Sequence, residues 1–168
     1  MSAGNHAQAL AFCARNMEVR ATIVMPEQTP FAKVERTRSY GAEIVLTGRD
    51  LNECESSVNA LIDAHGYTLI HPYDNSHVVA GQGTAGLEML RSVPDLDMLV
   101  VPIGGGGLIA GMALIAKSIK PEIQIIGVEA ELYPSVSVML AGAAPLNPDS
   151  LIRGVKVDLG EALGQPGF

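Results

Sequence analysis

The chain has 168 residues and a formal net charge of −7, with 48% hydrophobic and 4% aromatic residues. This length suits one domain or two small halves, and the hydrophobic content supports a buried core, which argues against a disordered chain. The acidic balance argues against nucleic acid and anionic membranes as partners, and no apolar run reaches the roughly 18 residues that span a bilayer.

The first residues and the cysteines indicate the compartment. The chain opens with Met-Ser-Ala-Gly-Asn-His, which lacks the basic head and apolar stretch of a signal peptide. Cys13 and Cys54 are isolated within helical patterns. We expect both to be small buried hydrophobic residues, as free cysteines usually are, in a reduced, cytoplasmic setting.

Helical and strand patterns alternate from the start of the chain. Apolar residues on one helical face predict a helix over residues 6–16, and the short apolar run 21–25, closed by a proline, predicts a buried strand. Thr29 is the predicted N-cap of the next helix, with proline at the first helical position, and this helix ends near Tyr40. Residues 43–46 form the second predicted strand.

A third helix and strand complete the first half. Asp50 is the predicted N-cap of this helix, with a glutamate three residues later, and Gly66 ends it. Residues 68–70 are predicted to form a strand, and the turn-rich stretch 71–75 separates the two halves.

The second half repeats the alternation. It predicts a helix over 78–91, an apolar strand over 98–103, a helix over 108–119, a strand over 123–128 and a short helix near 135–140. Strands separated by single helices predict an α/β fold, with parallel sheets flanked by helices on both faces.

Four consecutive glycines, Gly104, Gly105, Gly106 and Gly107, join the strand 98–103 to the helix that follows. Their backbone is free to approach a ligand closely, and the helix N-terminus offers unpaired N–H groups, so the loop predicts a phosphate site. A tight turn without a ligand needs one or two glycines rather than four. The phosphate could also belong to a dinucleotide, because Gly105-x-Gly107-x-x-Ala110 matches the Rossmann fingerprint and Glu129 ends the next strand.

A second cluster of polar groups stands at the first predicted helix. Ser2-Ala3-Gly4-Asn5-His6-Ala7-Gln8 places hydroxyl, amide and imidazole groups around a glycine at the helix N-terminus. Such a loop can bind a carboxylate through backbone N–H groups and the helix dipole. Alternatively, Asn5 or Ser2 is a simple N-cap.

Several segments along the chain resemble one family when they are taken together. They are Ser2-Ala3-Gly4-Asn5-His6-Ala7-Gln8, Met25-Pro26, Lys33, Tyr40-Gly41-Ala42-Glu43, His71-Pro72-Tyr73-Asp74, Ala80-Gly81-Gln82-Gly83-Thr84 and Gly104-Gly105-Gly106-Gly107-Leu108. Their order and spacing resemble those of threonine dehydratases, whose fold type II of the pyridoxal-phosphate enzymes is shared by serine dehydratases and serine racemases. The resemblance implies a partial fold of this type: residues 1–71 as a truncated small domain and residues 72–168 as part of the large cofactor-binding domain.

The resemblance also implies roles for individual residues. The glycines Gly104, Gly105, Gly106 and Gly107 would hold the phosphate of pyridoxal phosphate. Asn5 would donate a hydrogen bond to the 3-oxygen of its ring, and Ser2, Ala3, Asn5 and His6 would bind the carboxylate of an amino-acid substrate. Serine racemases carry a second serine where Ala3 stands, so Ala3 favours a dehydratase. Close helix packing would explain the glycines Gly81, Gly83 and Gly86, each of which otherwise costs a helix about 1 kcal/mol.

The sequence departs from the family at the lysine that bonds covalently to the cofactor, the Schiff-base lysine. The family carries it upstream of the Ser-x-Gly-Asn-His loop, which begins here at residue 2, and none of Lys33, Lys117, Lys120 and Lys156 stands in its place. We therefore expect no catalytic residue in this chain and no covalent attachment of the cofactor. We also expect no metal, because Glu129 is a single carboxylate and Ser135 stands where a second acidic ligand is expected.

The sequence thus resembles a pyridoxal-phosphate-dependent threonine or serine ammonia-lyase that is inactive as an isolated chain. Its reaction would be α,β-elimination to a 2-oxo acid and ammonia. We expect it to form a homo-oligomer or to pair through an exposed sheet edge. The alternatives are a non-catalytic module that binds a phosphate or an amino acid, and a dinucleotide-binding Rossmann-like domain.

Overall fold

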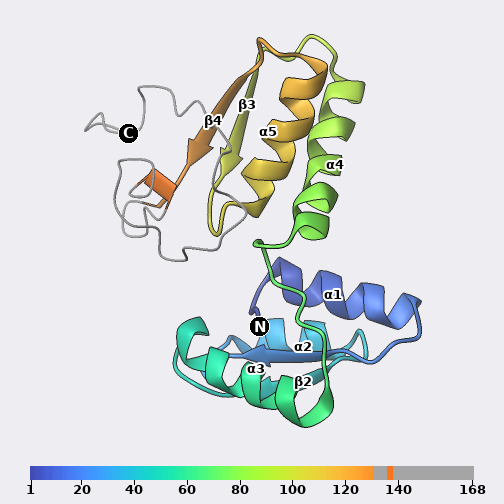
Figure 1. Cartoon of the computed structure of the whole chain (residues 1–168), viewed down its shortest axis with the longest axis vertical. Coiled ribbons are helices and arrows are strands. Elements are labelled where there is room, and N and C mark those ends of the chain that lie inside the picture. The colour runs from blue at the N-terminus through green and yellow to red at the C-terminus, as the bar shows by residue number, and fades with distance from the viewer. Residues whose placement is uncertain (131–135, 138–168) are drawn as a thin grey trace. The chain divides into compact units, whose positions relative to one another are not determined.

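The computed structural model describes residues 1–130 and 136–137. The chain divides into two compact units, Met1–Pro72 and Tyr73–Phe168, and each contains a pair of parallel strands with helices packed on it (Figure 1). The division falls one residue after the predicted boundary. In the part of the chain that the structure describes, no helix is long and apolar enough to cross a bilayer.

The first unit is a layered α/β structure. Its elements are α1 (Asn5–Asn16), β1 (Thr22–Met25), α2 (Phe31–Arg38), β2 (Glu43–Leu46) and α3 (Leu51–His65). The strands β1 and β2 pair in parallel, with Thr22 opposite Glu43. Because side chains alternate along β1, Ile23 and Met25 pack with α1 and α2, whereas Val24 packs with α3. Helices therefore cover both faces of this sheet, as the sequence predicts.

Local capping residues set the ends of α3. The side chain of Asp50 accepts a hydrogen bond from the backbone N–H of Glu53 at 3.0 Å, and Gly66 ends the helix in the left-handed region with φ 66°. Both agree with the sequence prediction. Cys54 of α3 is buried as predicted, but the prediction is wrong for Cys13, which is exposed on α1.

The predicted N-cap of α2 is also wrong. The N-cap position is occupied by Pro30, and α2 begins one residue later, at Phe31. The backbone N–H of Thr29 donates to the carbonyl of Pro26 at 3.0 Å and closes a turn. Thr29 is thereby held outside the helix, and its buried hydroxyl has no hydrogen-bond partner among the described residues.

The strand predicted over residues 68–70 does not form. One edge of β1 is paired with β2, and on its other edge the backbone N–H of Ser2 donates to the carbonyl of Val24 at 3.1 Å. A cavity of about 60 Å³ lies between β1, α3 and residues 67–70. In the described part of the chain the segment pairs with no strand, although its apolar residues suit one.

The second unit follows the predicted element order. Its elements are α4 (Ser76–Ser92), β3 (Met98–Pro102), α5 (Gly107–Ile119) and β4 (Gln124–Val128). The strands β3 and β4 pair in parallel, with Met98 opposite Gln124. Leu90 of α4 and Met112 of α5 belong to the same buried cluster as Leu99 of β3. The predicted short helix near 135–140 lies mostly outside the described residues.

Glycines bring α4 and α5 into backbone contact. A Cβ on Gly83 would lie 3.0 Å from the carbonyl oxygen of Gly111, and one on Gly86 would lie 3.3 Å from the Cα of Met112. A Cβ on Gly111 would lie 2.6 Å from the backbone nitrogen of Gly83, where backbone cannot yield. The expected role in close packing is therefore confirmed for Gly83 and Gly86. It is wrong for Gly81, where an added Cβ would meet no atom of the described residues within 4 Å.

The glycine contact predicts opposite effects of the same substitution at two positions. We expect Gly111→Ala to destabilise the chain by about 3 kcal/mol, because the two helices must separate to accept the methyl group. Gly81→Ala should be neutral or stabilise by up to about 1 kcal/mol, since it adds helix propensity without a steric clash. Urea unfolding followed by circular dichroism measures both, and equal stability of the two variants would contradict the close approach.

Candidate functional site

The tetraglycine loop Gly104–Gly107 begins α5 directly after β3. The backbone N–H of Ile103 donates to the carbonyl of Val128 at 2.7 Å, which extends the parallel pairing up to the loop. Gly106 is the N-cap of α5 and has φ 87°, a left-handed conformation that requires glycine. The loop thus leaves the sheet and turns into the helix at this residue.

Two further glycines of this loop lie against Tyr73. A Cβ on Gly105 would fall inside the Tyr73 ring, next to its Cγ, Cδ1 and Cε1 atoms. A Cβ on Gly107 would lie 2.9 Å from the Cα and Cβ of Tyr73. Gly104 differs from both, because an added Cβ would meet no atom of the described residues within 4 Å.

These contacts weaken the argument from the number of glycines. Gly106 is explained by its backbone conformation, and Gly105 and Gly107 by the approach of Tyr73. Sequence reasoning missed Tyr73 as a neighbour of the loop. No periodic pattern links it to glycines that stand two elements later in the chain.

The start of α5 nevertheless fits a phosphate group. No side chain caps the helix, and its first turn contains no acidic residue. The first N–H groups of any helix lack carbonyl acceptors within that helix, and they form the positive end of the helix dipole. These donors are a candidate cradle for a dianionic phosphate, and a Cβ on Gly104 would meet no atom of the described residues within 4 Å.

The start of α1 is a second uncapped helix end. The N-cap residue is Gly4, and no side chain caps the first turn. The backbone N–H of Gly4 donates to the hydroxyl of Ser2 at 3.3 Å, and Asn5 is already the first residue of the helix. The simple N-cap interpretation of Asn5 or Ser2 is therefore wrong. As at α5, the first turn carries no acidic side chain, so its N–H groups suit a carboxylate.

The ring of His6 points to a neighbouring segment. Its Nε2 lies 3.0 Å from the carbonyl oxygen of Ile70, so Nε2 donates the hydrogen bond. Burial lowers the pKa of His6, and the positive charges of His71 and the Met1 amine oppose its protonation further, although the bond to Ile70 partly offsets this. The imidazole thus joins α1 to residue 70. The part of His6 that remains available to a ligand at the start of the helix is its backbone N–H group.

The candidate residues therefore form two sets. The carboxylate loop with Ser2, Ala3, Asn5 and His6 belongs to the first unit, and the glycines Gly104 to Gly107 belong to the second. Within each unit the predicted residues lie together at the start of one helix.

The lysines of the described residues are placed away from the tetraglycine loop or outside its unit. Lys33 is exposed on α2 of the first unit. Lys117 and Lys120 lie at the other end of α5, where Lys117 donates to the carbonyl of Pro121 at 3.1 Å and Lys120 to that of Leu96 at 2.8 Å. Lys156 lies outside the described residues.

The carboxylate of Glu129 forms hydrogen bonds with other residues of the chain. It accepts hydrogen bonds from the backbone N–H groups of Val136 and Ser137, both at 2.8 Å, and from the Ser137 hydroxyl at 2.5 Å. Ser135 lies outside the residues that the structure describes. In the described part, no three acidic, histidine or cysteine side chains cluster closely enough for a metal ion.

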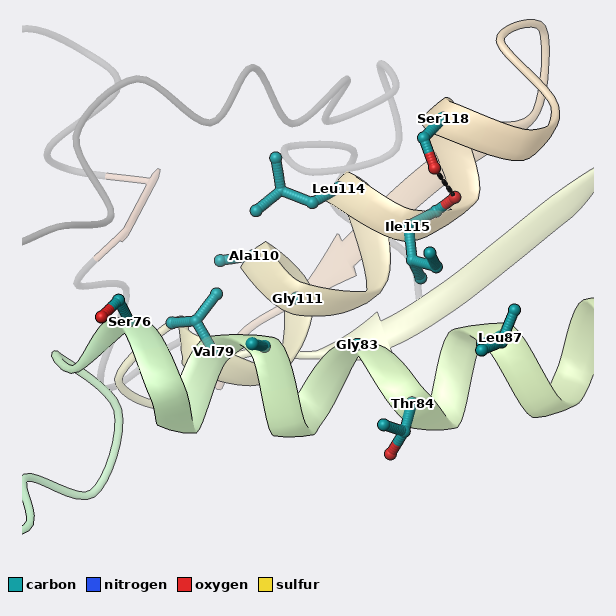
Figure 2. A pocket seen from close by; sticks show the side chains of 11 residues that line it. Ser76, Val79, Gly83, Thr84, Leu87, Ala110, Gly111, Leu114, Ile115 and Ser118 are labelled. Atoms are coloured by element: carbon teal, nitrogen blue, oxygen red, sulfur yellow. Dashed lines mark hydrogen bonds between the residues drawn. The ribbon is translucent and has the colours of Figure 1, made fainter.

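A groove of the second unit is chemically unlike these helix ends. It has a volume of about 560 Å³ and lies between α4 and α5 (Figure 2). Val79, Leu87, Leu114 and Ile115 line it, and the polar groups of its lining are hydroxyls. With no ionisable side chain, the groove offers nothing for the charges of an amino acid or a phosphate.

Comparisons with known proteins point to one family. Residues 1–164 match the family model described as "Pyridoxal-phosphate dependent enzyme". The chain is 50% identical over 130 residues to a catabolic L-threonine dehydratase, TdcB, of Staphylococcus aureus, which covers 77% of this chain and 38% of that protein.

Solved structures agree with the sequence comparison. The processed form of threonine deaminase isoform 2 from Solanum lycopersicum has a TM-score of 0.80 and 38% identity, over 89% of this chain and 43% of that one. Maize serine racemase has a TM-score of 0.81 and 38% identity, over 89% and 46% of the two chains. The chain thus spans less than half the length of the relatives it matches.

The half-buried His6 ring predicts a loss of stability in mild acid. Its lowered pKa means that the unfolded chain binds the proton more readily, so the stability is present above about pH 6.5 and falls as the pH drops through this value. In His6→Gln, which keeps a donor for Ile70 but does not titrate, the fall should be shallower. Urea unfolding between pH 7 and 5 measures it.

The control is His65→Gln, which leaves the His6 contact with Ile70 intact and should retain the larger fall. An NMR titration in which the His6 ring takes up its proton at or above pH 6.5 would contradict the assignment.

Proposed function

Since the chain belongs to the family of pyridoxal-phosphate dependent enzymes, we propose that it is the cofactor- and substrate-binding part of a threonine or serine ammonia-lyase. The cofactor of this family is pyridoxal phosphate. The proposed parent reaction is an α,β-elimination that converts the amino acid to a 2-oxo acid and ammonia. The identity to a catabolic threonine dehydratase supports this class of reaction.

The observation that carries the proposal is the uncapped N-terminus of α5 at the tetraglycine loop. Its first-turn N–H groups, with no acidic side chain beside them, would hold the cofactor phosphate. Gly104 leaves the space through which the phosphate would approach the backbone. The phosphate would thus be bound by fixed dipoles, without a lysine or arginine in the loop.

The start of α1 would bind the substrate carboxylate by the same means. The N–H groups of its first turn are the donors, and the ring of His6 fixes this turn to Ile70 rather than contacting the substrate. Asn5, exposed at the first position of the helix, would direct its amide to the 3-oxygen of the cofactor ring. Ala3 provides no hydroxyl at the position of the second serine of the racemases.

When bound, the cofactor supplies the electron sink for removal of the proton from the α-carbon. Covalent attachment requires a lysine amine at the cofactor aldehyde. Lys117 and Lys120 lie at the opposite end of α5 from the phosphate cradle, and both amines donate to backbone carbonyls. We therefore propose that these 168 residues bind the cofactor without a covalent bond and are inactive by themselves.

The proposed place for a partner is the edge of β1 that does not pair with β2. The hydrogen bond from Ser2 to Val24 lies on the edge opposite β2, and the cavity beside it is lined by apolar residues of β1, α3 and residues 67–70. An extended segment placed there would pair with β1, so we propose association through this edge, including pairing with another copy.

The second candidate function is a non-catalytic module that binds a phosphate or an amino acid. The absence of a lysine beside the loop in the described residues favours it. A dinucleotide-binding role is less well supported, because Glu129, which would bind the ribose, accepts three hydrogen bonds from residues 136 and 137.

Titration of the purified chain with pyridoxal phosphate tests the proposal. We expect saturable binding by absorbance and no adduct on any lysine after borohydride reduction. Gly104→Asp should weaken binding at least about tenfold, since a carboxylate placed in open space at the cradle repels the phosphate, equivalent to about 1.4 kcal/mol. The matched control is Gly104→Asn, which has the same shape without the charge and should weaken binding less.

Each contrary outcome is informative. A lysine trapped by borohydride would contradict non-covalent binding, and equal affinities of the Asp and Asn variants would place the phosphate elsewhere. Absence of binding by the unsubstituted chain would overturn the proposed function.

A further inference from the structure

Tyr73 has an unusual position beside the proposed phosphate cradle. It precedes α4 in the chain, yet its ring lies directly on Gly105 and its backbone on Gly107. For Gly107, a Cβ would approach the Cα and Cβ of Tyr73 to 2.9 Å and its carbonyl oxygen to 3.0 Å. Distances below about 3 Å to backbone atoms cannot be relieved by a side-chain rotation, so one residue restrains the loop at two places.

The two contacts flank the residue that turns the chain into α5. Gly106 lies between them and has φ 87° and ψ −10°. Gly105 and Gly107 have no left-handed φ of their own, so contact with Tyr73, and not their torsion angles, requires them to lack a side chain. Tyr73 therefore restrains the backbone on both sides of the only left-handed residue of the loop.

Tyr73 is followed closely by the capped start of α4. Two residues after it, the side chain of Asn75 caps α4 by accepting hydrogen bonds from the N–H groups of His77 at 2.9 Å and Val78 at 3.2 Å. Further along, α4 packs backbone to backbone on α5 through Gly83 and Gly111. Because α5 starts at the loop and α4 starts three residues after Tyr73, the contacts of Tyr73 with the loop glycines and the contact between Gly83 and Gly111 join the same two segments of the chain at two places.

We propose that Tyr73 is a positioning residue of the tetraglycine loop, holding Gly105 and Gly107 so that the first N–H groups of α5 are presented to a phosphate monoester. It acts through the glycines and does not itself bind the phosphate. This inference rests on the proposed function only for the identity of the ligand, because the contact between Tyr73 and the glycines is a property of the chain alone.

A double-mutant cycle tests the contact without any ligand. Gly105→Ala should lower the unfolding midpoint in the wild-type background, and at least half of that decrease should disappear in Tyr73→Ala, where the methyl group finds room. Gly104→Ala is the matched control, because its Cβ meets neither Tyr73 nor any other described residue within 4 Å and its effect should be the same in both backgrounds. Additive effects of Gly105→Ala and Tyr73→Ala would overturn the proposal.

Cofactor affinity tests the positioning role. Tyr73→Ala, at a temperature where circular dichroism shows it folded, should bind pyridoxal phosphate at least about tenfold more weakly, whereas Tyr73→Phe, which keeps the ring, should bind within about threefold of wild type. If Tyr73→Ala does not fold, Tyr73→Leu takes its place. Wild-type affinity in the folded Ala or Leu variant would overturn the positioning role.

The failure of the proposed function would look different. In that case the unsubstituted chain would not bind pyridoxal phosphate, and the unfolding cycle would still decide whether Tyr73 restrains the loop. Coupling in the cycle would then support the restraint, and additivity would overturn it.

Discussion

The geometry of the second unit depends on the close approach of two helix backbones. Gly83 and Gly111 allow α4 and α5 to touch where any side chain would push them apart. Leu90 of α4 and Met112 of α5 then reach the same face of β3 and β4 and close the core. Since α5 starts at the tetraglycine loop and α4 starts just after Tyr73, the same approach brings that residue to the loop. The proposed cradle is thus a consequence of helix packing as much as of its own glycines.

Helix ends without side-chain caps recur at the proposed binding residues, but the missing cap alone does not identify them. The helices α3 and α4 are capped by Asp50 and Asn75, whereas α1 and α5 begin at Gly4 and Gly106 without a side-chain cap. The helix α2 also lacks a side-chain cap and carries no binding motif. What distinguishes α1 and α5 is the glycine at the N-cap, which lets a ligand replace the missing side chain.

Sequence reasoning succeeded where structure is set locally and failed where it depends on distant partners. The strand at 43–46 and the ends of α3 follow from apolar pattern, Asp50 and Gly66, all within one stretch of chain. Residues 68–70 have a suitable pattern, but a strand needs a paired neighbour, which no local pattern supplies. Tyr73 was missed for the same reason. The exposed position of Gly81 was predictable, because it lies two residues from Gly83 and five from Gly86, off their shared helical face.

The four glycines show that the number of glycines in a loop is by itself weak evidence for a ligand site. A phosphate was inferred partly because a turn does not need four of them, yet three have reasons within the protein: backbone torsion at Gly106 and contact with Tyr73 at Gly105 and Gly107. Gly104 is the one of the four for which the structure shows neither a left-handed φ nor a neighbour that a Cβ would meet. Among the described residues, no atom would obstruct a Cβ at this position. Residue 104, rather than the motif as a whole, is therefore the position at which a substitution tests the proposed phosphate site most directly.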